Sequence, residues 1–429
     1  MPATIESLPI ELLAHVATYL DFQPVGSLRL ASRTLLSKLS PVHLPQFFAY
    51  KNVKLDHGSL HELIYMTCPG RAGCVLQHCF ITGVLSNDSD SLALTRLLTD
   101  AFVNLKRNSP CAGLVSLRVN VRASPEGSRF NHNEEDESPW SPPQDSSLLQ
   151  ISCCMARQTF ETITAALLES QLSVNEYFDV LGGVQGCSLS YRDALPSITH
   201  LASTTTVFGS LKKLTLRLSS IRISSVRIPD TYDQSVYSTD RIRQSMHGSS
   251  LLQRLLVMLV SMPHLEELDI HWYNFSSLDS DDNLDLDITV PLESPHLKLK
   301  DCSLRGLYVA EEDLLRYLKA VRPNNLTLTD IHLIPGSWTS IFEYLSSSIS
   351  PITSYRLDDL RESDGLLVHF NGMPGQSKFP YRGVQMGPST LTRQMGEDGG
   401  AIRYQTTRRR PLGSPERVRW LRNKRLEFG

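Results

Sequence analysis

Residues 211–216 read Leu-Lys-Lys-Leu-Thr-Leu, with apolar side chains at the first, fourth and sixth positions. The same spacing returns in residues 114–119 (Leu-Val-Ser-Leu-Arg-Val), 265–270 (Leu-Glu-Glu-Leu-Asp-Ile) and 304–309 (Leu-Arg-Gly-Leu-Tyr-Val). A looser copy occupies residues 352–357 (Ile-Thr-Ser-Tyr-Arg-Leu). Apolar and polar residues that alternate over so short a length predict a β-strand with one buried face. We therefore expect five short strands that share one core.

Helical patterns lie between these strands. Met155–Leu172, Leu251–Met262, Glu311–Val321 and Ser337–Leu345 each repeat apolar residues at helical spacing. Glu311 opens an acidic first turn, and Pro323 follows the end of the same segment. Strand, loop and helix in alternation form the unit of a leucine-rich-repeat solenoid.

The spacing of the strands is irregular, because 97 residues separate Leu114 from Leu211 whereas such repeats measure about 20 to 29 residues. The fold class that we expect is α/β, with an irregular, degenerate leucine-rich-repeat-like solenoid over residues 71–370. An ordinary α/β domain with leucine-rich strands remains the alternative.

The first forty residues predict two short helices. Leu8, Leu12, Val16 and Leu20 recur at four-residue steps, and Leu13 widens the apolar stripe. We expect Ser7 to cap the first helix, with Pro9 and Glu11 in its first turn.

The second helical run has Val25, Leu28, Leu35 and Leu36 as its apolar residues, and Ser40-Pro41 is expected to end it. Two helices of this size do not bury both of their faces alone. They pack either on the body of the same chain or on a partner.

Residues 8–39, LPIELLAHVATYLDFQPVGSLRLASRTLLSKL, resemble an F-box. The resemblance implies docking onto the Skp-family adaptor of an SCF (cullin–RING) ubiquitin ligase. The residues that it would assign to adaptor binding are Leu8, Pro9, Glu11, Leu12, Val16, Leu20, Leu28 and Leu30. The sequence departs from the family pattern at Leu35, where an aromatic residue is usual, and at Gly26 inside the second helix.

The resemblance extends to filamentous-fungal F-box proteins. It places an F-box in residues 1–45 and a connecting segment in residues 46–70, where Phe47-Phe48 form a hinge before a strand, Val53–Leu55, and a helix, Ser59–Met66. Near the other end, Gly336-Ser337-Trp338 opens a helix as in the last repeat of such proteins.

Four segments are expected to be loops or tails. Residues 124–147, 224–249 and 276–295 are polar or acidic and predict disordered insertions into the solenoid. Residues 371–429 predict a flexible tail that is rich in glycine at first and basic later.

Composition narrows the class of protein. The net charge of −3 does not indicate a nucleic-acid or membrane partner. The N-terminus carries no signal peptide, and the most apolar run, residues 255–260, is far shorter than the roughly 20 residues of a membrane-spanning helix. Eight scattered cysteines are expected to be free thiols in a reducing compartment. We expect a soluble protein that is cytoplasmic, nuclear or both.

Patterns typical of catalysis or metal binding are weak. Cys68, Cys74, His78 and Cys79 lack the paired spacing of a zinc site. The acidic run in residues 279–287 lacks the glycine and glutamate of a calcium loop. We therefore expect no catalytic residue, no metal and no cofactor.

Three functions follow from these observations. The first is a substrate receptor of an SCF-type ubiquitin ligase, in which the F-box binds the adaptor, the solenoid binds an unknown target protein, and the chain itself is not an enzyme. The second is an F-box scaffold outside the ligase, which the departures at Leu35 and Gly26 favour. The third is an intracellular α/β enzyme whose first helices merely resemble an F-box.

Overall fold

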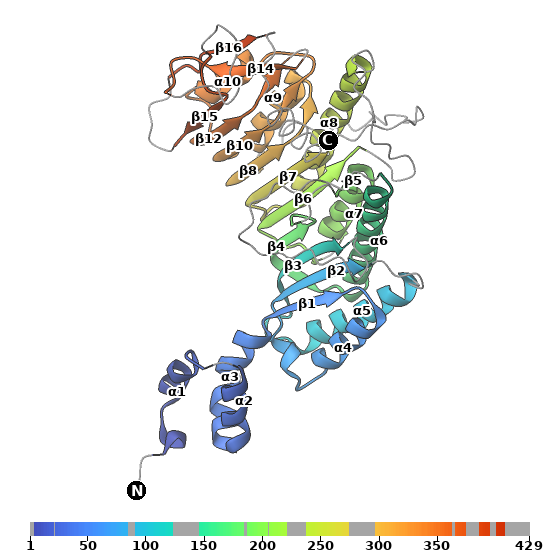
Figure 1. The fold of residues 1–429 in the computed structure, drawn as a ribbon, viewed down its shortest axis with the longest axis vertical. Coiled ribbons are helices and arrows are strands. Elements are labelled where there is room, and N and C mark those ends of the chain that lie inside the picture. Colours follow the sequence, from blue (N-terminus) through green and yellow to red (C-terminus); the bar gives the residue numbers. More distant parts are fainter. Residues whose placement is uncertain are drawn as a thin grey trace.

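The chain is a mixed α/β protein built around a large, mostly parallel sheet (Figure 1). The expectation of an α/β fold is thereby confirmed. The computed structural model describes residues 4–20, 22–84, 91–122, 146–183, 187–204, 206–220, 237–273, 297–362, 365–374, 386–394 and 400–407.

The larger sheet has 11 strands within these described ranges. Its order is β1-β2-β3-β4-β6-β7-β8-β10-β12-β15, with β5 paired to β6. All pairs are parallel except the last, where β15 runs antiparallel to β12. The strands are β1 (Tyr50–Lys54), β2 (His78–Val84), β3 (Gly113–Arg122), β4 (Ser173–Val180), β5 (Leu189–Ser190), β6 (Lys213–Ser219), β7 (Glu267–Tyr273), β8 (Asp301–Arg305), β10 (Asn325–Thr329), β12 (Ser354–Asp358) and β15 (Thr390–Arg393).

Helices connect most of the parallel strands, as parallel pairing requires a crossover, whereas the connection from β7 to β8 lies largely outside the described residues. Figure 1 shows α4, α5, α6, α7 and α8 along one side of the sheet. The bounds of the helices that follow β1 are α4 (His57–Thr67), η2 (Ala72–Val75), α5 (Ser91–Asn108), α6 (Ser146–Ser170), α7 (Tyr191–Thr204), α8 (Tyr237–Val260), α9 (Glu311–Val321) and α10 (Thr339–Ser346).

One continuous core lies between the sheet and these helices. It takes every second residue of the strands, such as Leu117, Phe178 and Leu214, and the apolar stripes of the helices, such as Phe102 and Ile163. The opposite residues of the same strands therefore form the outer face of the sheet.

A second sheet of five strands covers the C-terminal part of the described chain, in the order β16-β14-β13-β11-β9. Its strands β9, β11 and β13 pair in parallel, whereas β14 and β16 are antiparallel to their neighbours. The bounds are β9 (Tyr308–Val309), β11 (His332–Leu333), β13 (Arg361–Glu362), β14 (Leu366–Phe370) and β16 (Tyr404–Thr407).

Four of the five strands predicted from the leucine pattern lie where it placed them, in β3, β6, β7 and β12. The fourth copy of the pattern, residues 304–309, is shifted. Leu268 and Ile270 of β7 pair with Cys302 and Leu304 of β8, so the equivalent hexamer begins at Leu299. Cys302 takes the place of the middle leucine and is buried, which explains why the pattern misled us there.

Two segments expected to be loops contain regular structure. Tyr237–Ser249, within the expected insertion 224–249, forms the first half of α8. Its polar residues are used in packing, since the Ser245 hydroxyl donates to the carbonyl of Ile334 and Ser249 accepts from the Ala310 amide. In the expected tail 371–429, β15 and β16 pair with β12 and β14.

The other expected insertions, 124–147 and 276–295, lie wholly or almost wholly outside the described residues, as does the basic end of the tail.

Three helices precede the sheet: α1 (Ile10–Ala17), α2 (Phe22–Ala31) and α3 (Arg33–Phe48), after a short 3₁₀ turn, η1 (Ile5–Ser7). Ser7 is not the cap of α1. The residue before a proline favours extended backbone, as Leu8 shows (φ −64°, ψ 142°), so the helix starts only after Pro9.

The second helical run is split and longer than expected. It breaks at Ser32, whose hydroxyl accepts a hydrogen bond from the Thr34 amide at 3.1 Å, and α3 then continues through Pro41 to Phe48. The buried residues Leu35 and Leu39 stand one helical turn apart. Their burial holds α3 against its neighbours over the turn that leads to the proline.

No helix in the described part of the chain is both long and apolar enough to cross a membrane.

Candidate functional site

The N-terminal helices have a small core of their own. Leu13 and Ala17 of α1 and Leu35 and Leu39 of α3 are buried together, separately from the core under the sheet. Lys38 fastens the segment before α1 to α3, because its ammonium group donates to the carbonyls of Glu6 (2.8 Å) and Leu8 (2.9 Å). Among the side chains that the structure describes in α1 to α3, these four and Val25 are the buried ones.

The same helices expose a large share of apolar surface. Among the described residues, 15 large apolar side chains are exposed, and seven of them lie in η1 to α3. They are Ile5, Ile10, Leu12, Val16, Tyr19, Leu30 and Leu36. Since this segment is about a tenth of the chain, the concentration indicates an interaction surface rather than scattered exposure.

Helix α1 is apolar on two faces. Leu13 and Ala17 point into the small core, whereas Leu12 and Val16, also four residues apart, remain exposed. A surface helix needs only one apolar stripe to pack on its own protein. The second stripe is thus available to another molecule.

The eight residues that the sequence assigned to adaptor binding divide into two groups. Leu8 and Leu28 are half-buried against the small core, and Leu20 is also half-buried. The other five are exposed. These exposed residues are Pro9, Glu11, Leu12, Val16 and Leu30.

Tyr19 and Ile10 extend this exposed surface and were missed by sequence reasoning, although Tyr19 lies seven residues after Leu12 and so continues its stripe. Leu13, which the sequence placed in one stripe with Leu12, belongs to the core instead.

The outer face of the large sheet is a second surface, lined by polar and aromatic side chains. One row runs across the strands from Tyr50 to Lys213. Tyr50 stacks on His78, with ring centroids 4.2 Å apart, and the Nδ1 atom of His78 lies 2.8 Å from the Ser116 hydroxyl. Tyr177 pairs in register with Ser116, and the Lys213 ammonium lies over its ring at 5.4 Å.

Charges along this row are largely paired. Lys213 forms an ion pair with Glu267 at 2.9 Å, and this contact raises the pKa of the lysine. Burial lowers the pKa of His78, an effect that the Glu176 carboxylate opposes. His78 is consequently biased towards the neutral form near pH 7.

Arg118 is the most distinctive side chain of the neighbouring row. Its guanidinium carbon lies 5.1 Å from the ring centroids of both Phe80 and Tyr177. The side chain remains 43% exposed, and its Nε atom is 3.8 Å from the Asp179 carboxylate. Two aromatic rings from different strands thus hold an accessible guanidinium in place.

Besides its contact with Arg118, Asp179 binds Tyr177 on its own strand and Gly182 just after that strand. Its carboxylate accepts from the Tyr177 hydroxyl (2.9 Å) and from the Gly182 amide (2.8 Å). Burial is the main cause that raises the pKa of Tyr177, and the nearby Asp179 carboxylate raises this pKa further. The tyrosine therefore stays a neutral hydrogen-bond donor.

The cysteines considered as metal ligands are separated by strand geometry. His78 faces outward, whereas Cys79, the next residue of β2, is buried in the core, where desolvation raises its pKa to about 12. The Cys74 thiol donates to the Cys68 carbonyl at 3.1 Å. No group of three potential metal ligands occurs among the described residues.

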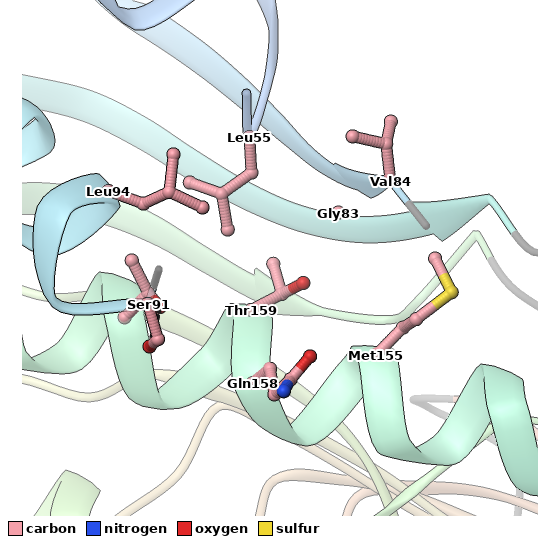
Figure 2. Close-up of a pocket in the computed structure, with 9 residues that line it drawn as sticks. Leu55, Gly83, Val84, Ser91, Leu94, Met155, Gln158 and Thr159 are labelled. Carbon is pink, nitrogen blue, oxygen red and sulfur yellow. Dashed lines mark hydrogen bonds between the residues drawn. The ribbon is translucent and has the colours of Figure 1, made fainter. Parts of the chain in front are cut away.

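A pocket opens at the carboxyl ends of β1 and β2, between α5 and α6 (Figure 2). Leu55, Val84, Leu94 and Met155 give it apolar walls. Its polar lining consists of the hydroxyl groups of Ser91, Thr159 and Thr162 and the amide of Gln158, and the ninth lining residue is Gly83. None of these nine residues ionises near neutral pH.

Comparison with family models and with curated proteins finds no match to this chain.

Proposed function

We propose that this chain is a substrate-receptor subunit of an SCF-type cullin–RING ubiquitin ligase. In this proposal the exposed apolar surface of α1 to α3 docks onto a Skp-family adaptor, and the body of the chain holds a target protein. The proposal rests on the F-box-like sequence of residues 8–39 together with one structural observation.

That observation is the pairing of a minimal core with a large exposed apolar surface in the same three helices. The four clustered side chains and Val25, the buried ones that the structure describes in these helices, are few for an independent unit, and a partner that covers Leu12, Val16 and Leu30 adds burial. Binding of the adaptor would then stabilise the folded state of these helices.

The strand order supports a solenoid-like body as part of the proposal. Along the main sheet each strand pairs with the next strand of that same sheet in chain order, apart from the short β5, while β9, β11, β13 and β14 belong to the second sheet. Near the C-terminal end, the paired residues Asp301, Asn325 and Ser354 are 24 and 29 residues apart, close to the length of a leucine-rich repeat. Such stacked units present long faces to protein partners.

The proposed activity contains no covalent step on this chain. The receptor contributes proximity, since a target held on the body is kept at a high effective concentration near the ubiquitin-charged conjugating enzyme. Transfer to a target lysine is catalysed elsewhere in the ligase.

Two matched pairs of variants of the full chain test the adaptor surface. Leu12→Glu is compared with Val260→Glu, at residues 52% and 50% exposed, and Leu30→Glu with Ile349→Glu, at residues 90% and 84% exposed. Binding to purified Skp adaptor is measured by pull-down and isothermal titration. We expect both N-terminal variants to lose at least tenfold in affinity, the effect of about 1.4 kcal/mol, and both controls to bind as wild type.

The same experiment separates the alternatives. A folded wild-type chain that does not bind the adaptor refutes the proposal. Adaptor binding without recruitment of a cullin would instead favour the scaffold outside the ligase.

A further inference from the structure

The outer face of β2 to β6 carries three arginines. They are Arg118, Arg122 and Arg217, and all three lie on β3 or β6. The registers of β3, β4 and β6 set Arg118, Asp179 and Thr215 side by side, with Arg217 two residues further along β6. Arg122 is the exposed last residue of β3.

The carboxylates of the surrounding strands are engaged. Asp179 lies 3.8 Å from the Nε atom of Arg118, Glu267 binds Lys213, and Glu176 lies 3.4 Å from Lys212. Asp269 stands on β7, three strands and hence about 14 Å from Arg118, but on the strand next to Arg217 and Lys213, and its charge, after that of Glu267, helps to raise the pKa of Lys213. With Arg118 beside Asp179 and Lys213 paired to Glu267, Arg122 and Arg217 leave positive charge in excess on the described part of this face, although the whole chain has a net charge of −3.

Arg118 is also pre-positioned. The rings of Phe80 and Tyr177 flank its guanidinium, so little side-chain freedom is left to lose when an anion binds. A planar, immobilised guanidinium matches the two oxygens of a carboxylate or a phosphate group better than an ammonium does. Because Phe80, Tyr177 and Arg118 come from three strands, an extended segment that crosses the strands would meet all of them.

We propose that this face binds an acidic segment of a partner protein. Arg118 would form hydrogen bonds with a carboxylate or phosphate group, and the positive charges of Arg122 and Arg217 would attract the same segment. The inference rests on the proposed function in one respect, since the partner would be the target of the receptor. It names the class of target: a protein that presents a run of acidic side chains in extended conformation.

The test uses the full chain and fluorescein-labelled peptides in anisotropy titrations. The probes are an octaglutamate peptide, a serine-glycine peptide with four phosphoserines, and octaglutamine as the neutral control. We expect saturable binding of one or both acidic probes, none of octaglutamine, and weaker binding in 0.5 M salt. The stronger acidic probe identifies the carboxylate or the phosphate as the preferred group.

Variants locate the binding. Arg118→Gln should weaken it about 10- to 100-fold, as expected for one lost charge-assisted contact, and Arg118→Lys should fall between it and wild type because only the charge is kept. Arg356→Gln is the matched control, an exposed arginine in the same row at the far end of the sheet. Arg122→Gln, at an exposed strand end, provides a second weakening variant that leaves the aromatic cradle intact.

The inference is overturned if the acidic probes bind no better than octaglutamine, or if Arg118→Gln and Arg122→Gln both bind like wild type while circular dichroism shows them folded. Adaptor binding is measured on the same preparations. A chain that binds the adaptor but no acidic probe refutes this inference alone, whereas one that binds the probe but no adaptor refutes the ligase proposal alone.

Discussion

Replacing Leu35 by alanine removes one of the four side chains that form the small core of α1 and α3. Burial of each leucine contributes about 1.5–3 kcal/mol, so the three leucines of this core supply roughly 5–9 kcal/mol before any entropy cost. A buried leucine replaced by alanine costs about 2–5 kcal/mol. The substitution therefore takes away a large part of what holds the helices together, and leaves the separate core under the sheet untouched.

Hydrogen–deuterium exchange measures this effect locally. We expect backbone amides of α1 and α3 to exchange at least 30-fold faster in Leu35→Ala, the effect of about 2 kcal/mol, while amides of β6 and β7 exchange as in wild type. Adaptor affinity should also fall, because part of the binding free energy would then be needed to order the helices.

The neighbouring residue supplies the control. Leu36 is 41% exposed, so Leu36→Ala should change the local stability by less than about 0.5 kcal/mol. Unchanged exchange of α1 in Leu35→Ala would show that this leucine does not hold the helices together. Equal acceleration throughout the sheet would show that the helices and the sheet unfold as one body, and either result contradicts this reasoning.

Three further outcomes are expected. Gly248→Ala should lower the free energy of unfolding by about 1–3 kcal/mol in urea titrations, since an added Cβ would collide with the carbonyl of Tyr308; a wild-type midpoint would refute the close packing. Maleimide at pH 8 should label the exposed Cys111 in the native protein, as detected by mass spectrometry. Cys302 should be labelled only after unfolding, because burial shields its thiol and raises its pKa to about 12. Burial lowers the pKa of His369, so as the pH falls below about 6.5 the unfolded state binds a proton more readily than the folded state, and the free energy of unfolding decreases. In urea titrations at several pH values, His369→Gln should reduce this decrease by up to about 1.4 kcal/mol per pH unit.

The sequence predicted the fold where local pattern and packing agree. Helix α9 has the predicted bounds, Glu311–Val321, because its acidic first turn, its apolar stripe and the nearby proline all act within the segment itself. The first half of α8 was mistaken for a loop, because its buried polar groups bind partners more than 50 residues away, such as Ile334. Strands β15 and β16 were missed for a similar reason: antiparallel pairing over a long distance leaves no periodic signal.

The candidate surfaces were predictable to different degrees. The helical steps from Leu8 to Leu20 indicated an apolar stripe, but which residues face inward depends on how α1 meets α3, and Leu13 rather than Leu12 is buried. The cradle around Arg118 could not be predicted from local pattern. Its rings lie 38 and 59 residues away in the chain and are brought together only by the registers of β2, β3 and β4.

The order of the main sheet also bears on how the chain folds during synthesis. Because almost every strand of the main sheet pairs with the preceding strand of that sheet, a growing chain has already made each partner strand when the next one leaves the ribosome. Small sequence separations between paired strands keep the entropy of closure small, as for the paired residues Asp301, Asn325 and Ser354 of β8, β10 and β12, which are 24 and 29 residues apart. The exception is the end, where β15 and β16 pair antiparallel, so completion of the two sheets waits for the last strands to be translated.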